Sequence, residues 1–276
     1  MKIGIIGVGN MGRMLTEALI DANTVSPSSL TIANRTMFKA LVLKNIYRDI
    51  TVAKNAEDVA KVSNLIFLCV KPLEMQGVIE DILPYLTKEK CVVSITSPVN
   101  VRQLESVIPC SVARTIPSIT NRARAGVSLI TFGHRCSDEW KEKLQHLFRD
   151  ISNPIEIEDK VTRVASDIVS CGPAFFSYLA QRFINAAVKE TEIDKETAIT
   201  LMSEMLVGMG ELLKHQYYTL PTLQEKVCVK GGITGEGIKV LEEELGDVFE
   251  HVIQATHNKF KVDLEEVNKQ FPIKHS

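Results

Sequence analysis

The 276-residue sequence has few of the features that mark specialised classes of protein. Its six cysteines are scattered without a C-x-x-C pair, which argues against a disulfide framework and favours buried, reduced thiols. The six histidines show no metal-ligand or catalytic-triad spacing. A formal charge of −2, with both signs mixed along the chain, gives no electrostatic footprint for nucleic acid or an anionic membrane. We therefore expect no metal site and no nucleic-acid partner.

Long apolar runs are also missing. A membrane-spanning helix needs roughly 18 uninterrupted apolar residues, and no window of this sequence reaches that length. The apolar N-terminal twenty residues contain four glycines and are interrupted by Arg13 and Glu17, which is not the pattern of a signal peptide. We expect a protein that has no membrane partner and is cytoplasmic. With 45% hydrophobic residues, the chain is long enough to form two domains.

The first half of the sequence alternates short β-branched runs with segments of helical period. Candidate helices lie at 10–22, 36–46, 55–62, 73–86, 100–107 and 138–150. Candidate strands lie at 2–6, 30–33, 50–53, 65–70, 91–95, 112–115, 127–131 and 154–157. This alternation predicts an α/β fold with a doubly wound, mostly parallel sheet covered by helices on both faces.

After about residue 160 the strand pattern stops. Helical patterns follow at 160–171, 173–192, 195–217, 220–229, 234–246 and 248–270, and they predict an all-helical second domain. Asp194 is a good N-cap, and Pro221 suits the start of a helix. The segment 202–213, MSEMLVGMGELL, is rich in methionine and glycine, which suits either a subunit interface or core packing within the monomer.

The strongest motif is GVGNMG at residues 7–12, because it follows a predicted strand and opens a predicted helix. In that context Gly7 allows a tight turn, Gly9 lets a backbone approach closely, and Gly12 lets the helix pack on the strand. The first N–H groups of the helix then face a pyrophosphate. The motif predicts a bound dinucleotide in a Rossmann domain.

The end of the second strand indicates which dinucleotide. An acidic residue there would bind the ribose 2′-hydroxyl of NAD, but this sequence has Asn34, Arg35 and Thr36. An amide, a guanidinium and a hydroxyl suit a 2′-phosphate, so NADP is favoured over NAD. Lys71, at the carboxyl end of the fourth strand, is either a wall of the cofactor site or a surface lysine.

Several motifs lie in the order and spacing of pyrroline-5-carboxylate reductases, which complete proline synthesis. They are GVGNMG, NRT at 34–36, Asn55 before a helix, VKP at 70–72, VVSI at 92–95 and, above all, LPTLQEKVCVKGGITGEGIKVLE at 220–242. The sequence resembles this family over essentially its whole length, and within it the ComER-type late-competence branch of bacilli. The resemblance implies an NAD(P)-binding Rossmann domain, 1–159, a helical dimerisation and substrate domain, 160–276, and an active site between them.

The resemblance also implies roles for individual residues. The cofactor would contact Gly7, Val8, Gly9, Asn10, Met11, Gly12, Asn34, Arg35, Thr36, Asn55, Val70, Lys71 and Pro72. The substrate, an imino acid, would contact Cys171, Gly172, Gly231, Gly232 and Thr234. The sequence around 230–234, KGGIT, precedes a helical run, so its consecutive N–H groups suit a carboxylate. Thr234 and Lys230 are the candidate catalytic residues.

This sequence departs from the family where the substrate would bind. The loop after VVSI, usually Ala-Ala-Gly, is Thr96-Ser97-Pro98, and the serine-proline before the paired glycines is Val229-Lys230. Replacing serine with valine removes a hydrogen-bonding group from a small polar pocket, which costs discrimination between substrates. Lys230 either compensates by binding the carboxylate or points to solvent.

The sequence is consistent with three hypotheses about function. The first is an NADP-dependent reductase of pyrroline-5-carboxylate or a related cyclic imino acid. The second is an NADP-binding regulatory relative with little or no reductase activity. The third, a β-hydroxyacid dehydrogenase of similar plan, would need a lysine in the segment 175–186, FFSYLAQRFINA, which has none.

Overall fold

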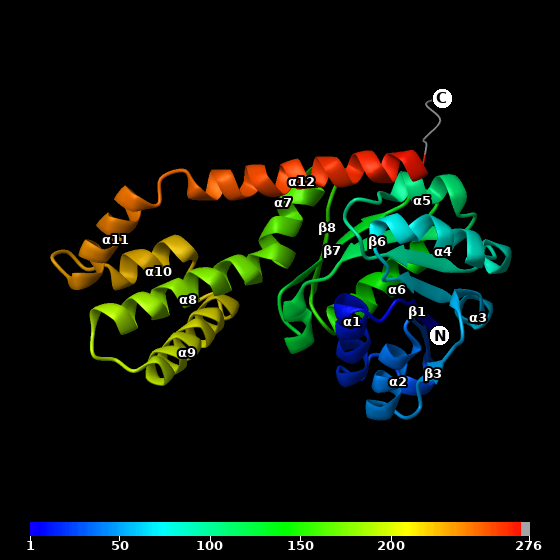
Figure 1. The fold of residues 1–276 in the computed structure, drawn as a ribbon, viewed down its shortest axis with the longest axis horizontal. Coiled ribbons are helices and arrows are strands. Elements are labelled where there is room, and N and C mark those ends of the chain that lie inside the picture. Colours follow the sequence, from blue (N-terminus) through cyan, green and yellow to red (C-terminus); the bar gives the residue numbers. More distant parts are fainter. Residues whose placement is uncertain (272–276) are drawn as a thin grey trace. The chain divides into compact units, whose positions relative to one another are not determined.

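The computed structural model describes residues 1–271 and contains a single eight-stranded sheet (Figure 1). The strand order is β3-β2-β1-β4-β5-β6-β7-β8, and every neighbouring pair is parallel except β6 and β7. The strands are β1 (Ile3–Ile6), β2 (Leu30–Ala33), β3 (Thr51–Val52), β4 (Leu65–Leu68), β5 (Cys91–Ser94), β6 (Ser111–Ile116), β7 (Val127–Phe132) and β8 (Asn153–Glu156). All eight predicted strands are confirmed, and the chain reverses at β1 as in a doubly wound sheet.

Helices cover both faces of this sheet. On one face lie α1 (Asn10–Asp21), α2 (Met37–Ile46) and α6 (Asp138–Arg149). On the other lie α3 (Ala56–Val62), α4 (Met75–Ile82) and α5 (Val101–Val107). Successive side chains of a strand point to opposite faces of the sheet and so join different apolar layers. Ile5 packs with the first group of helices and Ile6 with the second. The predicted Rossmann architecture is therefore present.

Several helix starts follow the capping rules read from the sequence. The Asn55 side chain accepts the N–H of Asp58 at 2.9 Å, and Asp194 accepts the N–H of Thr197 at 2.9 Å. Asn100 and Gln103 form a reciprocal capping box at the start of α5. Each bond satisfies a backbone donor that has no partner within the helix.

After Glu156 the described chain forms no further strand. The helices are α7 (Thr162–Ser166), a π-helix (Asp167–Cys171), α8 (Gly172–Glu190), α9 (Lys195–Lys214), α10 (Leu220–Val227), α11 (Ile233–Glu244) and α12 (Val248–Gln270). Short 3₁₀ helices occupy Pro27–Ser29, Pro72–Glu74, Leu83–Tyr85, Ile119–Ala123 and Asp159–Val161. Secondary structure thus changes from mixed to helical close to the residue 160 expected from the sequence.

The chain forms two compact units, whose boundaries differ from the predicted boundary at residue 160. Unit 1 comprises Met1–Pro173 and the described chain from Ala255 onward, and unit 2 comprises Ala174–Gln254. The second half of α12 belongs to unit 1, where Val267 and Phe271 are 0% and 2% exposed within the apolar layer beneath α3, α4 and α5. Gln103 also donates to Asn268 Oδ1 at 2.8 Å. The helical period of 248–270 predicts the helix but gives no sign of this contact.

Within residues 1–271, no helix combines the length and the apolar character that crossing a membrane requires.

Candidate active site

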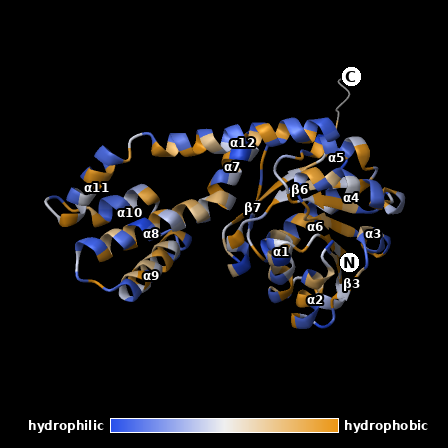
Figure 2. Cartoon of the chain, in the orientation of Figure 1, coloured by the Kyte–Doolittle hydropathy of each residue, from blue (hydrophilic) through white to orange (hydrophobic). Residues whose placement is uncertain are grey.

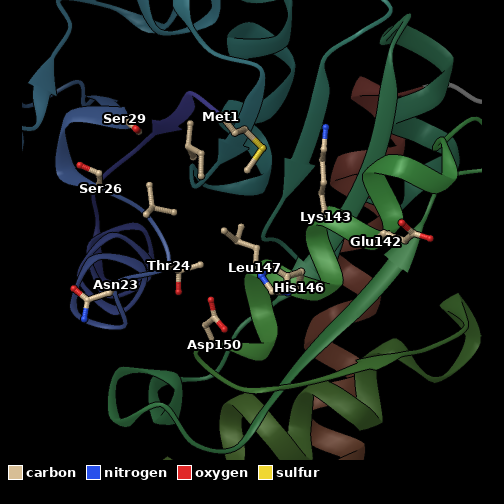
Figure 3. A pocket seen from close by; sticks show the side chains of 12 residues that line it. Met1, Asn23, Thr24, Ser26, Ser29, Glu142, Lys143, His146, Leu147 and Asp150 are labelled. Atoms are coloured by element: carbon tan, nitrogen blue, oxygen red, sulfur yellow. The ribbon is translucent and has the colours of Figure 1, made fainter.

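Two hollows in unit 1 lie at opposite ends of the strands. The first, about 630 Å³, is bordered by Met1, the loop before β2 and α6, with Thr24, His146 and Asp150 among its labelled residues (Figure 3). It lies at the amino ends of β1 and β2. The second, about 470 Å³, is lined by Ile6, Ala33 and Val70. These residues lie at the carboxyl ends of parallel strands, where open α/β sheets bind ligands. We therefore assign the candidate dinucleotide site to the second hollow.

Two glycines of the 7–12 loop are required by the local geometry. Gly7 has φ +97°, and a Cβ there would lie 2.5 Å from the carbonyl oxygen of Cys69. A Cβ at Gly12 would lie 2.0 Å from the carbonyl oxygen of Gly7, so α1 can pack this closely only without a side chain. A Cβ at Gly9 would meet nothing within 4 Å. Gly9 lines the hollow and leaves room for an occupant.

The start of α1 has the properties of an anion site. Its N-cap is Gly9, which provides no side-chain hydrogen bond to the first turn. The N–H groups of that turn are therefore not taken by a capping side chain, and the positive end of the helix dipole lies beside the hollow. Asn10 is exposed, whereas Val8 is only 3% exposed and Met11 packs against the apolar core.

Asn34 holds the glycine loop in place. Its side-chain oxygen accepts the N–H of Val8 at 2.9 Å, and its side-chain nitrogen donates to the carbonyl of Thr36 at 3.0 Å. The amide thus ties the loop after β1 to the end of β2. Its contribution to the hollow is chiefly to position the backbone, while Arg35 and Thr36 present exposed side chains.

The hollow is rich in positive charge. Four cationic side chains line it, from Arg35, Lys39, Lys54 and Lys71, against one carboxylate, Glu74. Arg35 Nη1 lies 2.9 Å from Glu74 Oε1, with side-chain exposures of 84% and 38%. Such a surplus of cations favours a ligand with phosphate groups.

Most of the predicted cofactor residues lie together at this hollow. Gly7, Gly9, Asn34, Arg35, Thr36, Asn55, Val70 and Lys71 line it. Val8, Asn10, Met11, Gly12 and Pro72 do not line it; the first four belong to the loop and start of α1, and Pro72 opens the adjacent 3₁₀ helix. Sequence reasoning missed Lys39, Lys54 and Glu74. Lys39 lies three residues after Thr36 and Glu74 three after Lys71, a spacing that places residues on one side of a helical turn.

Cys69 also borders the hollow but is not a nucleophile. Burial raises the pKa of its thiol far above the ordinary range, so the sulfur remains protonated at neutral pH. Its role is to pack beneath the glycine loop.

A buried arginine anchors the loop that follows β5. Arg114 is 2% exposed, and its guanidinium donates to Asp159 at 2.7 Å and to the hydroxyl of Thr162 at 2.6 Å. It also donates to the carbonyl of Ser97 at 3.3 Å, within the divergent Thr96-Ser97-Pro98 loop. Burial lowers the pKa of Arg114, and the charge of Asp159 opposes that shift.

Cys171 and Gly172 lie at the end of a π-helix beside a buried acid. Asp167 accepts from Arg163 at 2.9 Å and from Thr256 at 2.8 Å, and Arg163 also lies 3.4 Å from the Cys171 sulfur. Burial raises the pKa of Cys171, and the nearby charge of Arg163 opposes that rise. Isolated π-helical turns occur frequently at functional sites, and this one directly precedes α8.

The remaining predicted substrate residues belong to unit 2. Gly232 is the N-cap of α11 and offers no side-chain bond to the first turn, so the N–H groups of Ile233 and Thr234 are not capped. The N–H of Gly232 donates to the carbonyl of Val229 at 2.9 Å. Gly231, Lys230 and Thr234 are exposed. The backbone is thus arranged to accept an anion at the start of α11.

Unit 2 also carries apolar side chains that its own chain leaves exposed. Along α8 and α9 the exposed fractions are 64% for Phe176, 62% for Tyr178, 69% for Phe183, 59% for Leu201 and 62% for Val207. Figure 2 shows hydrophobic residues recurring along α9. An apolar surface of this kind marks an interaction site.

Two family models match successive parts of the chain. Residues 2–98 match the model described as NADP oxidoreductase, coenzyme F420-dependent. Residues 159–262 match the model described as pyrroline-5-carboxylate reductase dimerisation.

Named relatives match over nearly the full length. ComE operon protein 4 of Bacillus subtilis is 56% identical over 99% of this chain and 100% of its own length. Pyrroline-5-carboxylate reductase 3 of the same organism is 32% identical over 98% of this chain and 99% of its own length.

Solved structures show the same fold. Pyrroline-5-carboxylate reductase from Coxiella burnetii superposes with a TM-score of 0.84 at 24% identity, covering 95% of this chain and 98% of that one. The Plasmodium falciparum pyrroline carboxylate reductase, solved with NADP bound, gives 0.81 at 22% identity, covering 98% and 97%.

Proposed function

Because the chain belongs to the pyrroline-5-carboxylate reductase family, we propose that it is an NADP-dependent reductase of the C=N bond of a cyclic imino acid. The observation that carries this proposal is the hollow at the carboxyl ends of β1, β2 and β4. It combines an uncapped helix start, a glycine whose missing side chain leaves open space, and four cationic side chains.

The residues present fit NADP. The uncapped first turn of α1 would hold the pyrophosphate, and Arg35, with Thr36 and Lys39 beside it, would hold the 2′-phosphate. The amide of Asn34 would keep the loop in position, as it does in this structure. When bound, NADPH supplies the hydride that reduces the C=N carbon.

The start of α11 is our proposed carboxylate site. Its uncapped N–H groups would donate to the carboxylate of the substrate, and the hydroxyl of Thr234 would either donate to that carboxylate or accept the N–H of the protonated imine, which favours the protonated form. Lys230 adds a positive charge in the adjacent turn. Cys171, which ends the π-helix, and Gly172, which begins α8, are further substrate contacts that the family resemblance implies.

A second candidate function rests on a specific observation. Val229 stands where the family has serine, and the relative named ComE operon protein 4 is more similar to this chain than the named reductase. A protein that binds NADP but reduces pyrroline-5-carboxylate slowly or not at all, and acts through a partner, fits both facts.

The decisive experiment is NADPH oxidation by the purified protein across a panel of cyclic imines that includes pyrroline-5-carboxylate. Turnover that falls in Thr234→Ala and returns in Thr234→Ser would support the reductase. Turnover by Lys230→Gln is compared with turnover by a matched control, Lys239→Gln, which removes an exposed lysine from the body of α11. NADPH binding without turnover on any member of the panel, and failure to restore growth of a proline-requiring strain, would favour the second candidate.

We also propose a homodimer formed through the C-terminal helices. The match to the dimerisation model and the exposed apolar side chains of α8 and α9 support it. Light scattering after gel filtration should give twice the mass of 30.7 kDa, and Phe183→Glu should shift the protein toward that single-chain mass.

A further inference from the structure

One ion pair stands out inside the dinucleotide hollow. Of the cationic side chains that line it, Arg35 alone is engaged with a carboxylate, that of Glu74 at 2.9 Å. Across residues 1–271, Lys39 and Lys54 enter no ion pair, and neither does Lys71. The cation best suited to a 2′-phosphate is therefore the one that already has an anionic partner.

Glu74 is held in place by the backbone around it. Its N–H donates to the carbonyl of Lys71 at 2.9 Å, which closes the 3₁₀ turn begun by Pro72. The following residue, Met75, is fully buried, and the carbonyl of Leu73 accepts from Gln270 at 3.0 Å. The Arg35 side chain, by contrast, is 84% exposed. The backbone that carries Glu74 is thus fixed, and the more exposed guanidinium is the partner that can turn away more freely.

A carboxylate and a phosphate bind a guanidinium in the same way. Both accept paired hydrogen bonds from its N–H groups, so one arginine cannot bind both well at the same time. A phosphate bound at Arg35 would also lie close to the negative charge of Glu74. NAD has a hydroxyl in place of this phosphate, so it neither competes with Glu74 for Arg35 nor is repelled by the charge of Glu74.

We propose that Glu74 determines cofactor specificity by competing with the 2′-phosphate of NADP for Arg35. The competition weakens the binding of NADP and leaves the binding of NAD almost unchanged. The affinities of the protein for the two cofactors therefore differ less than they would without Glu74. The inference rests on the proposed function, because it takes the hollow to be the NADP site. It assigns Glu74 a role opposite to that of the acidic residue that binds the ribose of NAD.

The expected effect is moderate because both side chains are partly solvated. Exposed ion pairs are worth little, and the repulsion between Glu74 and the phosphate adds to the loss, so Glu74→Gln should tighten NADPH binding about threefold to tenfold. The dissociation constant for NADH should change by less than about twofold. Because surface charges are screened, the gain should shrink at high salt.

The experiment titrates the full-length protein with NADPH and NADH by fluorescence, and with adenosine 2′,5′-bisphosphate and AMP by calorimetry. The variants are Glu74→Gln, Arg35→Gln and the double variant, which form a double-mutant cycle. Glu80→Gln is the matched control, because Glu80 is an exposed carboxylate on the adjacent α4 that does not line the hollow.

The proposal is supported if Glu74→Gln tightens NADPH and the bisphosphate, leaves NADH and AMP unchanged, and loses much of its effect in the Arg35→Gln background. It is overturned if Glu74→Gln binds NADPH as the wild type does, or if it weakens NADH, since Glu74 would then bind the ribose hydroxyl. A wild-type protein and a Glu74→Gln variant that both bind no dinucleotide would overturn the proposed function itself.

Discussion

The glycine loop at 7–12 and the segment at 229–234 are both short turns that lead into a helix with no capping side chain, yet they are built differently. In the first, a Cβ at Gly12 would lie 2.0 Å from a backbone oxygen. In the second, a Cβ at Gly231 would meet nothing within 4 Å, and Ile233 is 93% exposed. The chain's own packing determines the first turn, whereas in the second a Cβ at Gly232 would meet only the neighbouring Val229, 3.0 Å from its carbonyl oxygen.

This difference explains where the sequence departs from its family. Gly7 and Gly12 are fixed by backbone contacts and cannot gain a side chain without disturbing the fold, so these two positions of the motif are kept. Residues 229 and 230 carry no such constraint, and Val229 is 63% exposed. Function alone limits what occupies those positions, so a change of substrate, or the loss of one, appears there first.

The sharpest test of the comparison is a pair of alanine variants in the glycine loop. Gly12→Ala should destabilise the protein by about 3 kcal/mol or more, because the added carbon meets backbone. Gly9→Ala should unfold almost as the wild type does, yet weaken NADPH binding about a hundredfold by filling space that the pyrophosphate needs. Urea unfolding and fluorescence titration measure the two effects. A Gly9→Ala protein with normal affinity would contradict the assigned hollow.

The second test concerns the buried arginine under the loop after β5. Asp159→Asn removes the charged partner of Arg114 and should cost about 2 kcal/mol, less than for a fully buried pair because Asp159 is 40% exposed. Asp138→Asn, which affects a carboxylate that is 94% exposed, should leave the urea midpoint unchanged. Equal midpoints for the two variants would show that this ion pair does not stabilise unit 1.

A smaller effect is expected at Arg35. Arg35→Gln should weaken NADPH binding about tenfold and leave NADH unchanged, since only NADPH has a phosphate for the guanidinium. The wild type should accordingly bind NADPH more tightly than NADH. Fluorescence titration of both cofactors checks both statements, and equal or reversed wild-type affinities would remove the basis for assigning NADP.

The smallest effect is expected at Val229, in the segment 229–234. Turnover of pyrroline-5-carboxylate should be poor, and Val229→Ser should raise kcat/KM by up to about tenfold, because the hydroxyl restores a hydrogen-bonding group. The stability of the protein should not change, since Val229 is largely exposed. A vigorous wild-type enzyme that Val229→Ser leaves unaltered would show that the serine is dispensable in this chain.

Much of the fold was predictable because its signals are local. Alternating β-branched and helical patterns located all eight strands, and Asp194 caps the helix that it was expected to cap. The position of α12 was not predictable in the same way. Its apolar period indicates that one face is buried, but Val267 and Phe271 fill a layer formed by residues more than 150 positions earlier, and no local rule identifies such a partner.

The candidate site divides along similar lines. Arg35 and Lys71 were found because each ends a strand, and strand ends converge in a parallel sheet. Glu74 was missed because its importance comes from a partner 39 residues away. Asn34 was expected to touch the cofactor and lines the hollow, and the structure adds that its amide holds the loop. A motif names residue types, while their hydrogen bonds appear only in the folded chain.

The return of α12 to the sheet has a consequence for biosynthesis. Because Val267 and Phe271 complete an apolar layer that otherwise comes from the first 112 residues, we expect this layer to stay incomplete while the ribosome is still making the helices in between. We expect this layer to be completed only after Phe271 has been synthesised. A nascent chain stalled before that point would expose the unfilled layer to chaperones and proteases, so truncation before Val267 should lower the abundance of the sheet-containing part as well.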